Sequence, residues 1–323
     1  MNGRKHSVII ALILIIAGLL AAGASLASVG FDLSKLSTET YVTRTIEVNG
    51  DFSSITVAGD TEDIVFASSD DGMCRVVCRE PEDEPHRAEA SDGTLTIENT
   101  GRNRWHFFSF GFLAEGPSVT VYLPGKDYNA LDVQSDTGDL MLPEDITFDS
   151  VNIRLSTGGV DCMASVQGLL SVRTSTGHIV LSGMSANAIQ LSAGTGDVRI
   201  AYAECPGGIE ISTGTGETVL DSVTCRELVS TGSTGSLTMK NVIASGAFNL
   251  RRSTGSIRFD ACDAAEITAR TDTGSVKGSL LTGKTFSAHS GTGSVDVPES
   301  AAGGRCEVST DTGSIRIEVS GSP

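Results

Sequence analysis

The sequence is poor in positive charge, in histidine and in aromatic side chains. It has 23 lysines and arginines against 40 aspartates and glutamates, which gives a formal net charge of −17. Nucleic-acid binding needs clustered lysine and arginine, so this balance argues against a nucleic-acid partner. The five histidines are scattered, and they form no Ser/His/Asp set and no metal-ligand spacing. We therefore expect no catalytic residues, no bound metal and no cofactor.

Residues 131–319 also lack the three- and four-residue apolar spacing of an amphipathic helix. Instead, a Thr-Gly pair returns there every 19 or 20 residues, ten times in all. A near-fixed period of this length is typical of stacked supersecondary units. The glycines that mark the predicted turns are Gly138, Gly158, Gly177, Gly196, Gly216, Gly235, Gly255, Gly274, Gly293 and Gly313.

Four apolar columns emerge when the ten copies are aligned on these glycines. They stand seven and five positions before the glycine and two and four positions after it, beginning with Leu131, Val133, Leu140 and Leu142. A spacing of two describes two short strands, each with one buried face. One unit of about 19 residues cannot hide that face alone, so stacked units must share a continuous core.

The predicted fold is therefore an all-β, single-stranded parallel β-solenoid of ten turns over residues 126–319. Successive turns would stack in chain order about 4.8 Å apart. Glycine at each corner would allow a tight bend or a positive φ that a Cβ resists. The crossover preference of parallel strands favours a right-handed coil. The threonine before each glycine shares the pleat phase of the apolar columns, which predicts an inward ladder of ten threonines.

Residues 1–30 form a separate N-terminal segment. Residues 8–29 carry no charge, and as a helix they would span about 33 Å, enough to cross a bilayer. Arg4 and Lys5 precede this stretch, so the chain from about residue 31 onward is expected to be extracytoplasmic, on a single-pass membrane anchor. A signal peptide cleaved near Ala22-Gly23-Ala24 is the alternative, and the protein would then be secreted.

Residues 31–40 are a predicted spacer, and residues 41–125 are a predicted irregular β section that caps the solenoid. An open solenoid end is an unpaired strand edge and needs such a cap. The acidic run at residues 80–85 is expected to be a solvated loop. Strands are predicted in this section at residues 41–48, 53–58, 63–67, 73–79, 94–98 and 118–123.

Seven cysteines in an exported chain raise the question of disulfides. Cys162 and Cys306 occupy apolar columns, and Cys205 and Cys225 stand where other turns place alanine. We therefore expect the thiols to pack as small hydrophobic groups. Because Cys205 and Cys225 lie one turn apart in one column, a disulfide or a metal pair between them stays open.

Aromatic residues make up only 5% of the chain, yet five of them fall within residues 105–112. One interpretation is a strand or flap that covers the solenoid end. The other is an exposed patch for a partner or for the membrane interface, helped by Arg102 and Arg104. The patch consists of Trp105, Phe107, Phe108, Phe110 and Phe112.

The sequence patterns do not fit aspartic proteases or glycan-active β-helix enzymes. Asp136-Thr137-Gly138 matches the Asp-Thr-Gly of aspartic proteases, but that chemistry needs two carboxylates that share one proton. Other turns place serine or glycine at the aspartate position. Glycan-active β-helix enzymes build grooves from long inserted loops, whereas the interval between glycines here never exceeds 20 residues. We therefore expect that the protein is not an enzyme.

The chain resembles a bacterial family of putative adhesins of unknown function with β-strand repeats. The resemblance covers residues 41–319 and rests on the apolar N-terminus, on residues 52–57, 94–98 and 119–124, and on the Thr-Gly turns. It implies a cell-envelope protein and supplies no catalytic or binding residues.

From this resemblance we expect a non-enzymatic cell-surface module that binds a surface protein or a glycan. One alternative is a structural or envelope-stress scaffold that associates through the edge near residues 315–319. A glycan-active β-helix enzyme is the third hypothesis.

Overall fold

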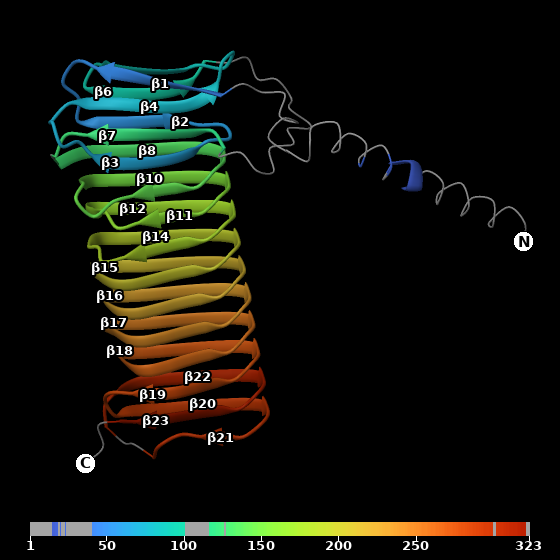
Figure 1. Cartoon of the computed structure of the whole chain (residues 1–323). Coiled ribbons are helices and arrows are strands. Elements are labelled where there is room, and N and C mark those ends of the chain that lie inside the picture. The colour runs from blue at the N-terminus through green and yellow to red at the C-terminus, as the bar shows by residue number, and fades with distance from the viewer. Residues whose placement is uncertain are drawn as a thin grey trace, which may run out of the picture.

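The computed structural model describes residues 15–18, 20, 23, 41–100, 116–125, 127–299 and 302–320. These residues form an all-β parallel β-solenoid of about nine turns, so the predicted fold class is confirmed. Figure 1 shows a straight column with β1 and β4 at one end and β20 and β21 at the other.

Seven strands form the N-terminal part of the column, and only one of them was not predicted from the sequence, β5. The other six lie within two residues of the predicted ranges. The strands are β1 (Tyr41–Val48), β2 (Ser54–Ala58), β3 (Asp63–Ser68), β4 (Cys74–Pro81), β5 (His86–Ser91), β6 (Thr94–Asn99) and β7 (Ser118–Leu123).

The repeated turns follow, each with a strand before the corner glycine and a strand after it. They comprise β8 (Asp127–Thr137), β9 (Leu140–Leu142), β10 (Thr147–Thr157), β11 (Val160–Cys162), β12 (Ser165–Thr176), β13 (Ile179–Ser182), β14 (Ala186–Thr195), β15 (Val198–Thr215), β16 (Thr218–Thr234), β17 (Leu237–Thr254), β18 (Ile257–Thr273), β19 (Val276–Leu280), β20 (Lys284–Thr292), β21 (Val295–Asp296), β22 (Gly304–Thr312) and β23 (Ile315–Val319).

Each Thr-Gly corner packs directly on the corner of a neighbouring turn. The ten glycines have φ between 118° and 151°, a region that side chains disfavour. A Cβ on Gly158 would lie 1.9 Å from the carbonyl oxygen of Gly138, and at the other corners this distance is between 1.9 and 2.2 Å. The Gly158 N–H donates to the Thr176 carbonyl at 2.8 Å. Glycine thus satisfies both the backbone conformation and the close approach of the turns.

The four apolar columns form one continuous core, as predicted. The residue two positions after each corner glycine is at most 1% exposed in every turn but one. The exception is Val295, which is 44% exposed. Its turn also leaves Phe286 and Ala288 only partly buried against the core. The core is therefore open at the turn that contains β20 and β21.

The ten threonines before the glycines face solvent, so the predicted inward ladder is wrong. They do stack in register, for example Thr157 between Thr137 and Thr176. The last inward position is instead three residues before the glycine, where Thr174 is 1% exposed and Arg252 is fully buried. The two-residue alternation ends there, because the chain begins to round the corner and the next two side chains point outward.

The stacking order departs from the chain order at the C-terminal end. β22 lies between β18 and β20, and Thr312 pairs with both Thr273 and Thr292. β23 lies likewise between β19 and β21. The last turn of the chain is thus inserted between two earlier turns, as Figure 1 shows. Of the predicted edge at residues 315–319, Ile315 and Arg316 are paired on both sides, by β19 and β21, so β20 and β21 form the outermost strands there.

The same inversion occurs at the N-terminal end. β2 lies between β6 and β8, and β3 lies between β7 and β9, all in parallel. β6 and β7 therefore form the outermost parallel turn. Antiparallel strands then cover it, with β5 on β6, β4 on β7 and β1 on β4. We call these three antiparallel strands, together with the β2–β3 and β6–β7 turns, the N-terminal cap.

All seven cysteines are free and buried, in agreement with their predicted role as small hydrophobic groups. Cys205 and Cys225 are in-register neighbours on β15 and β16, and they are not bonded to each other.

Of the predicted transmembrane helix, residues 15–18, 20 and 23 are described, and these are helical. Among the residues placed by the structure, no helix is long and apolar enough to cross a bilayer, and most of the predicted anchor lies outside those residues. The predicted spacer at residues 31–40 lies outside the described residues.

Candidate functional site

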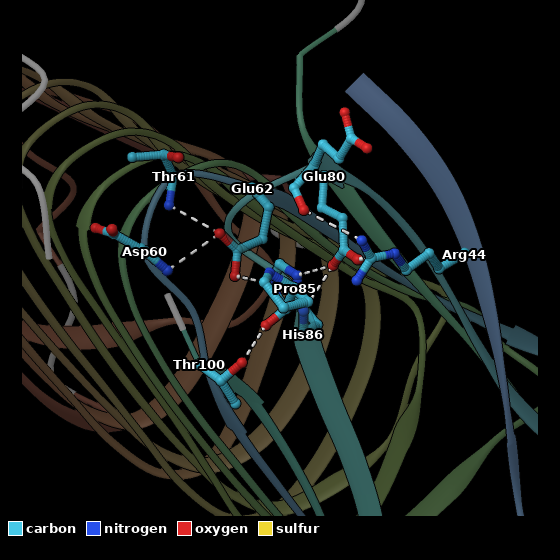
Figure 2. Close-up of polar contacts among 9 residues, drawn as sticks. Arg44, Asp60, Thr61, Glu62, Glu80, Pro85, His86 and Thr100 are labelled. Atoms are coloured by element: carbon cyan, nitrogen blue, oxygen red, sulfur yellow. Dashed lines mark hydrogen bonds and ion pairs between the residues drawn. The ribbon is translucent and has the colours of Figure 1, made fainter. Parts of the chain in front are cut away.

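Four segments of the N-terminal cap bring ionisable side chains together, three of them buried and the fourth, Arg44, exposed at the surface. Glu62 immediately precedes β3, Glu80 lies in β4, His86 begins β5 and Arg44 lies in β1. Figure 2 shows the His86 ring between the two carboxylates, with Arg44 beside Glu80. Glu62 is 2% exposed, Glu80 is fully buried and His86 is 8% exposed. We call these four residues the charge cluster.

The His86 ring is held by carboxylates on both of its nitrogens. Nδ1 lies 2.7 Å from Glu80 Oε2, and the His86 backbone N–H donates to the same oxygen at 2.7 Å. Nε2 lies 3.0 Å from Glu62 Oε1. When both carboxylates are ionised they only accept hydrogen bonds, and the ring then donates from both nitrogens. Burial lowers the pKa of His86, but the two carboxylates outweigh it and raise the pKa above its usual 6.5.

Glu62 is fixed by the backbone of its own loop. Its Oε2 accepts the N–H of Thr61 at 2.9 Å and the N–H of Asp60 at 3.2 Å. Burial raises the pKa of Glu62, but His86 and these backbone donors together lower it below 4.5. The β2–β3 loop is thereby tied to β5 through one charged side chain.

Arg44 completes the charge balance of the cluster. Its Nε lies 3.4 Å from Glu80 Oε1, and its other end donates to the Glu82 carbonyl at 3.2 Å. The cluster then contains two positive and two negative groups. Removing one member would leave a buried charge without its partner, which is strongly destabilising. The cluster therefore links β1, β4, β5 and the β2–β3 loop into one unit.

Cys78, Glu80 and His86 were tested as a metal site, because one ligand atom from each lies within 4.8 Å of the others. Cysteine, carboxylate and histidine are ligands that zinc accepts. Three observations speak against a resident metal here. Both ring nitrogens already face carboxylates, burial raises the pKa of the Cys78 thiol to about 12, and Arg44 brings positive charge to Glu80. The trio fits an ion-pair network and does not fit a metal.

A pocket of about 290 Å³ lies elsewhere in the N-terminal cap, beside the β1–β2 turn and the start of β4. None of the charge cluster lines it. Arg75 at its wall is held by Asp71, with Nη1 2.6 Å from Oδ2. The pocket is lined by Glu47, Val48, Asn49, Gly50, Asp51, Phe52, Gly72, Met73, Cys74, Arg75 and Pro124. The charge cluster and the pocket are therefore separate features of the N-terminal cap.

The sequence did not predict the charge cluster. The acidic run at residues 80–85 was expected in solvent, and this was wrong for Glu80, whose side chain is buried under β1. His86 was counted among scattered histidines. No local signal joins residues 62, 80 and 86, because they meet only when β4 and β5 fold over β7 and β6, next to the β2–β3 loop. The predicted aromatic patch at residues 105–112 lies outside the described residues, and the ten turn glycines all stand at the corners.

The fold and the cap define the class of protein: a β-solenoid repeat protein with one end closed by antiparallel strands. Within that class, the chain belongs to the Toastrack DUF4097 family, whose sequence model matches residues 52–217. The match runs from the N-terminal cap to the fifth of the ten corners. It confirms the resemblance to adhesin-like repeat proteins of unknown function that the sequence indicated.

Several solved structures are similar to the chain. A putative lipid binding protein from Parabacteroides distasonis is 16% identical, with 76% of this chain and 98% of that chain covered and a TM-score of 0.46. A putative adhesin from Bacteroides fragilis is 12% identical, with 87% and 99% covered and a TM-score of 0.39. A putative adhesin from Parabacteroides merdae is 10% identical, with 87% and 98% covered and a TM-score of 0.46. No curated protein matches the chain.

Proposed function

We propose that the protein is a non-enzymatic surface module that binds an extended anionic polymer, such as an acidic glycan, along one side of its solenoid. The observation that carries the proposal is a pair of arginines stacked on that side. Arg154 and Arg173 pair in register on β10 and β12, and both side chains are exposed. No ion pair joins either of them to an acidic side chain of the described chain.

Two like charges in direct register destabilise a sheet unless an anion lies between them. Such a pair is unexpected in a chain with a net charge of −17. Arginine binds carboxylate, sulfate and phosphate groups in a bidentate manner. The surrounding strands carry no inserted loop, since the corner glycines follow each other at 19 or 20 residues. An extended polymer could therefore lie across several turns and contact both arginines.

The non-enzymatic part of the proposal is supported by the N-terminal cap. Its acid–base cluster is buried and paired, so it offers no free group to a substrate. Export is also part of the proposal, and it rests on the uncharged stretch at residues 8–29 and on the basic residues before it. Alkaline phosphatase fused after residue 320 should be active if the body is outside the cytoplasmic membrane, and inactive if it is inside.

The binding proposal is tested with the full chain, an acidic polysaccharide and a neutral polysaccharide of similar length. We expect retention on the acidic polymer only. Changing Arg154 and Arg173 to serine, the residue that Ser192 and Ser212 place in the same column, should weaken binding by about tenfold or more, since two bidentate contacts are lost. A control that changes the exposed Arg199 and Arg258 to serine removes equal charge from the other side of the corner. Equal loss in both variants, or no retention, would overturn the proposal.

A further inference from the structure

The solenoid ends differently at its two poles. At the C-terminal pole the outermost strands are β20 and β21. β22 pairs with one side of β20, and among the described residues no strand pairs with its other side. Each inner corner N–H donates to a neighbouring turn, as Gly274 does to Thr312 and Gly313 does to Thr292. The corresponding N–H of Gly293 has no such acceptor within the described part of the chain.

The side chains of this pole show the same lack of cover. Val295 is 44% exposed, whereas its column equivalents in the other turns are at most 1% exposed. Phe286, Ala288 and Val297 are only partly buried against the core. A parallel edge with apolar side chains pointing along the axis is a template for another strand.

The N-terminal pole is closed to such pairing. Its outer strands, β1 and β5, each pair antiparallel with the strand beneath them and carry exposed charges, which are Arg44 and Glu47 on β1 and Arg87 and Glu89 on β5. Charged edge strands are a common means of preventing edge-to-edge association. Head-to-tail stacking of two molecules into a filament is therefore disfavoured, and only the C-terminal pole is left for pairing.

The distribution of charge favours a second copy of the same chain as the partner that pairs with the C-terminal pole. The chain has a net charge of −17, so most approaches of two copies are repulsive. β20 carries no acidic residue, and its one lysine or arginine is Lys284. Lys284 is 4% exposed and lies 2.6 Å from Asp263 Oδ1. Asp296 on β21 is offset by Arg316 at 3.1 Å. Glu299, exposed three residues after β21, adds one acidic group, so the C-terminal pole carries little net charge on a strongly acidic molecule.

We infer that two copies of the chain associate through this pole, with β20 of one copy antiparallel to β20 of the other. A two-fold axis through the middle of β20 uses the same edge in both copies, so assembly stops at a dimer. The unpaired backbone groups of both edges would then be satisfied, and Phe286, Ala288 and Val295 of each copy would cover the open core of the other.

The first test is sedimentation of the full chain in detergent micelles, with the detergent mass subtracted. We expect a particle of twice 33.5 kDa that dissociates on dilution. Val295→Lys should raise the dissociation constant by about tenfold or more, because each lysine would then set an unpaired positive charge against the open apolar core of the other copy. Ile243→Lys is the matched control, since Ile243 is 43% exposed on the side of the solenoid and the added charge is equal. Any association through the N-terminal segment is common to all three proteins.

The second test does not depend on the Val295 variant remaining folded. A spin label is attached to a Thr285→Cys variant, whose new thiol is exposed while the seven native thiols are buried. The dimer should give a short distance between the two labels. A label on Thr43→Cys in β1 should give no short distance. A monomer at about 100 µM, equal dissociation constants for the two lysine variants, or short distances only at β1 would overturn the inference. Neither test uses a polymer ligand, so failure here is distinct from failure of the proposed binding function.

Discussion

At the scale of single residues, two separate features require glycine at the corners: the positive φ and the close approach of the neighbouring turn. The energetic cost of each can be measured separately. Gly196 has φ of 142°, and a Cβ there would lie 2.0 Å from the Gly177 carbonyl oxygen. Gly183 also has a positive φ, 64°, but nothing lies within 4 Å of the place of its Cβ. The conformational demand acts on both glycines, and the steric demand acts only on Gly196.

We predict that Gly196→Ala destabilises the fold by at least about 3 kcal/mol, from backbone strain and overpacking together. Gly183→Ala should cost about 1 kcal/mol, since only the left-handed conformation penalises it. Urea unfolding of both variants checks this difference. Equal losses would show that the close approach of turns is unimportant.

The charge cluster gives a pH dependence with a defined sign. The pKa of His86 is raised in the folded state, so the stability that His86 contributes is complete below about 6.5 and is lost as the pH rises through its folded pKa. The pKa of Glu62 is lowered. Its contribution is present above about 4.5 and is lost as the pH falls through its folded pKa. The cluster is fully effective between these two limits.

We predict that the urea midpoint of the native chain falls as the pH is raised above about 6.5. The His86→Gln variant should be less stable at pH 6 and should lack this decline. His289→Gln, which changes an exposed histidine, is the control and should follow the native profile. If the urea midpoint of the His86→Gln variant fell equally with rising pH, the charge cluster would not be the cause of the decline.

Arg252 is an exception among the buried residues of its column. Its pKa is lowered to about 10 by burial, and it is bonded to Ser230 and to the Arg251 carbonyl, with no carboxylate among its described partners. In the neighbouring turn the same column holds Gly232, and a Cβ on Gly232 would lie 2.9 Å from the Arg252 side chain. The arginine therefore fills the volume that Gly232 leaves empty.

We predict that Arg252→Thr and Gly232→Thr are each destabilising, the first by leaving a void and the second by a clash. The double variant should recover at least about 1 kcal/mol relative to the sum of the two, because threonine then stands in both turns as in Thr213 and Thr271. A double-mutant cycle in urea measures this coupling. Strict additivity would mean that the two sites are independent.

At the scale of elements, the inverted order of the end turns affects local stability. β22 and β23 come last in the chain but lie inside the stack, with partners on both sides. β20 and β21 precede them in the chain yet form the edge. Local opening is easiest where few neighbours hold a strand.

We predict that the amides of β20 and β21 exchange with deuterium faster than those of β22 and β23, by about tenfold or more, at a concentration where the chain is monomeric. Peptide-resolved exchange mass spectrometry measures this. A simple decline of protection towards the C-terminus would contradict the inverted order. The same measurement at high concentration should protect β20 if the two-fold contact forms.

At the scale of the whole molecule, the acidic net charge of the body opposes association, while the low net charge of the C-terminal pole permits it. The acidic body repels other copies of itself, and this repulsion is screened by salt. We predict that association through β20 becomes tighter between about 50 and 300 mM salt, as sedimentation would measure. Weaker association at high salt would indicate that ion pairs hold the contact. Binding of an anionic polymer at Arg154 and Arg173 should instead become weaker as the salt concentration rises.

The repeat period by itself determined the architecture. A glycine every 19 or 20 residues, with apolar residues two apart on both sides of it, is the pattern of a stacked parallel coil. It also determined which residues face the core, up to three positions before each corner. It did not determine the direction of the threonines, since the corner itself breaks the alternation of the strand.

Only the tertiary structure decided the order of the end turns and the assembly of the charge cluster. The ten copies have nearly equivalent columns, so the pattern fits any stacking order, and the short loops and the covering strands select one. Glu62, Glu80 and His86 meet because β4 and β5 fold back over the coil, and no spacing in the sequence records a contact made between separate strands.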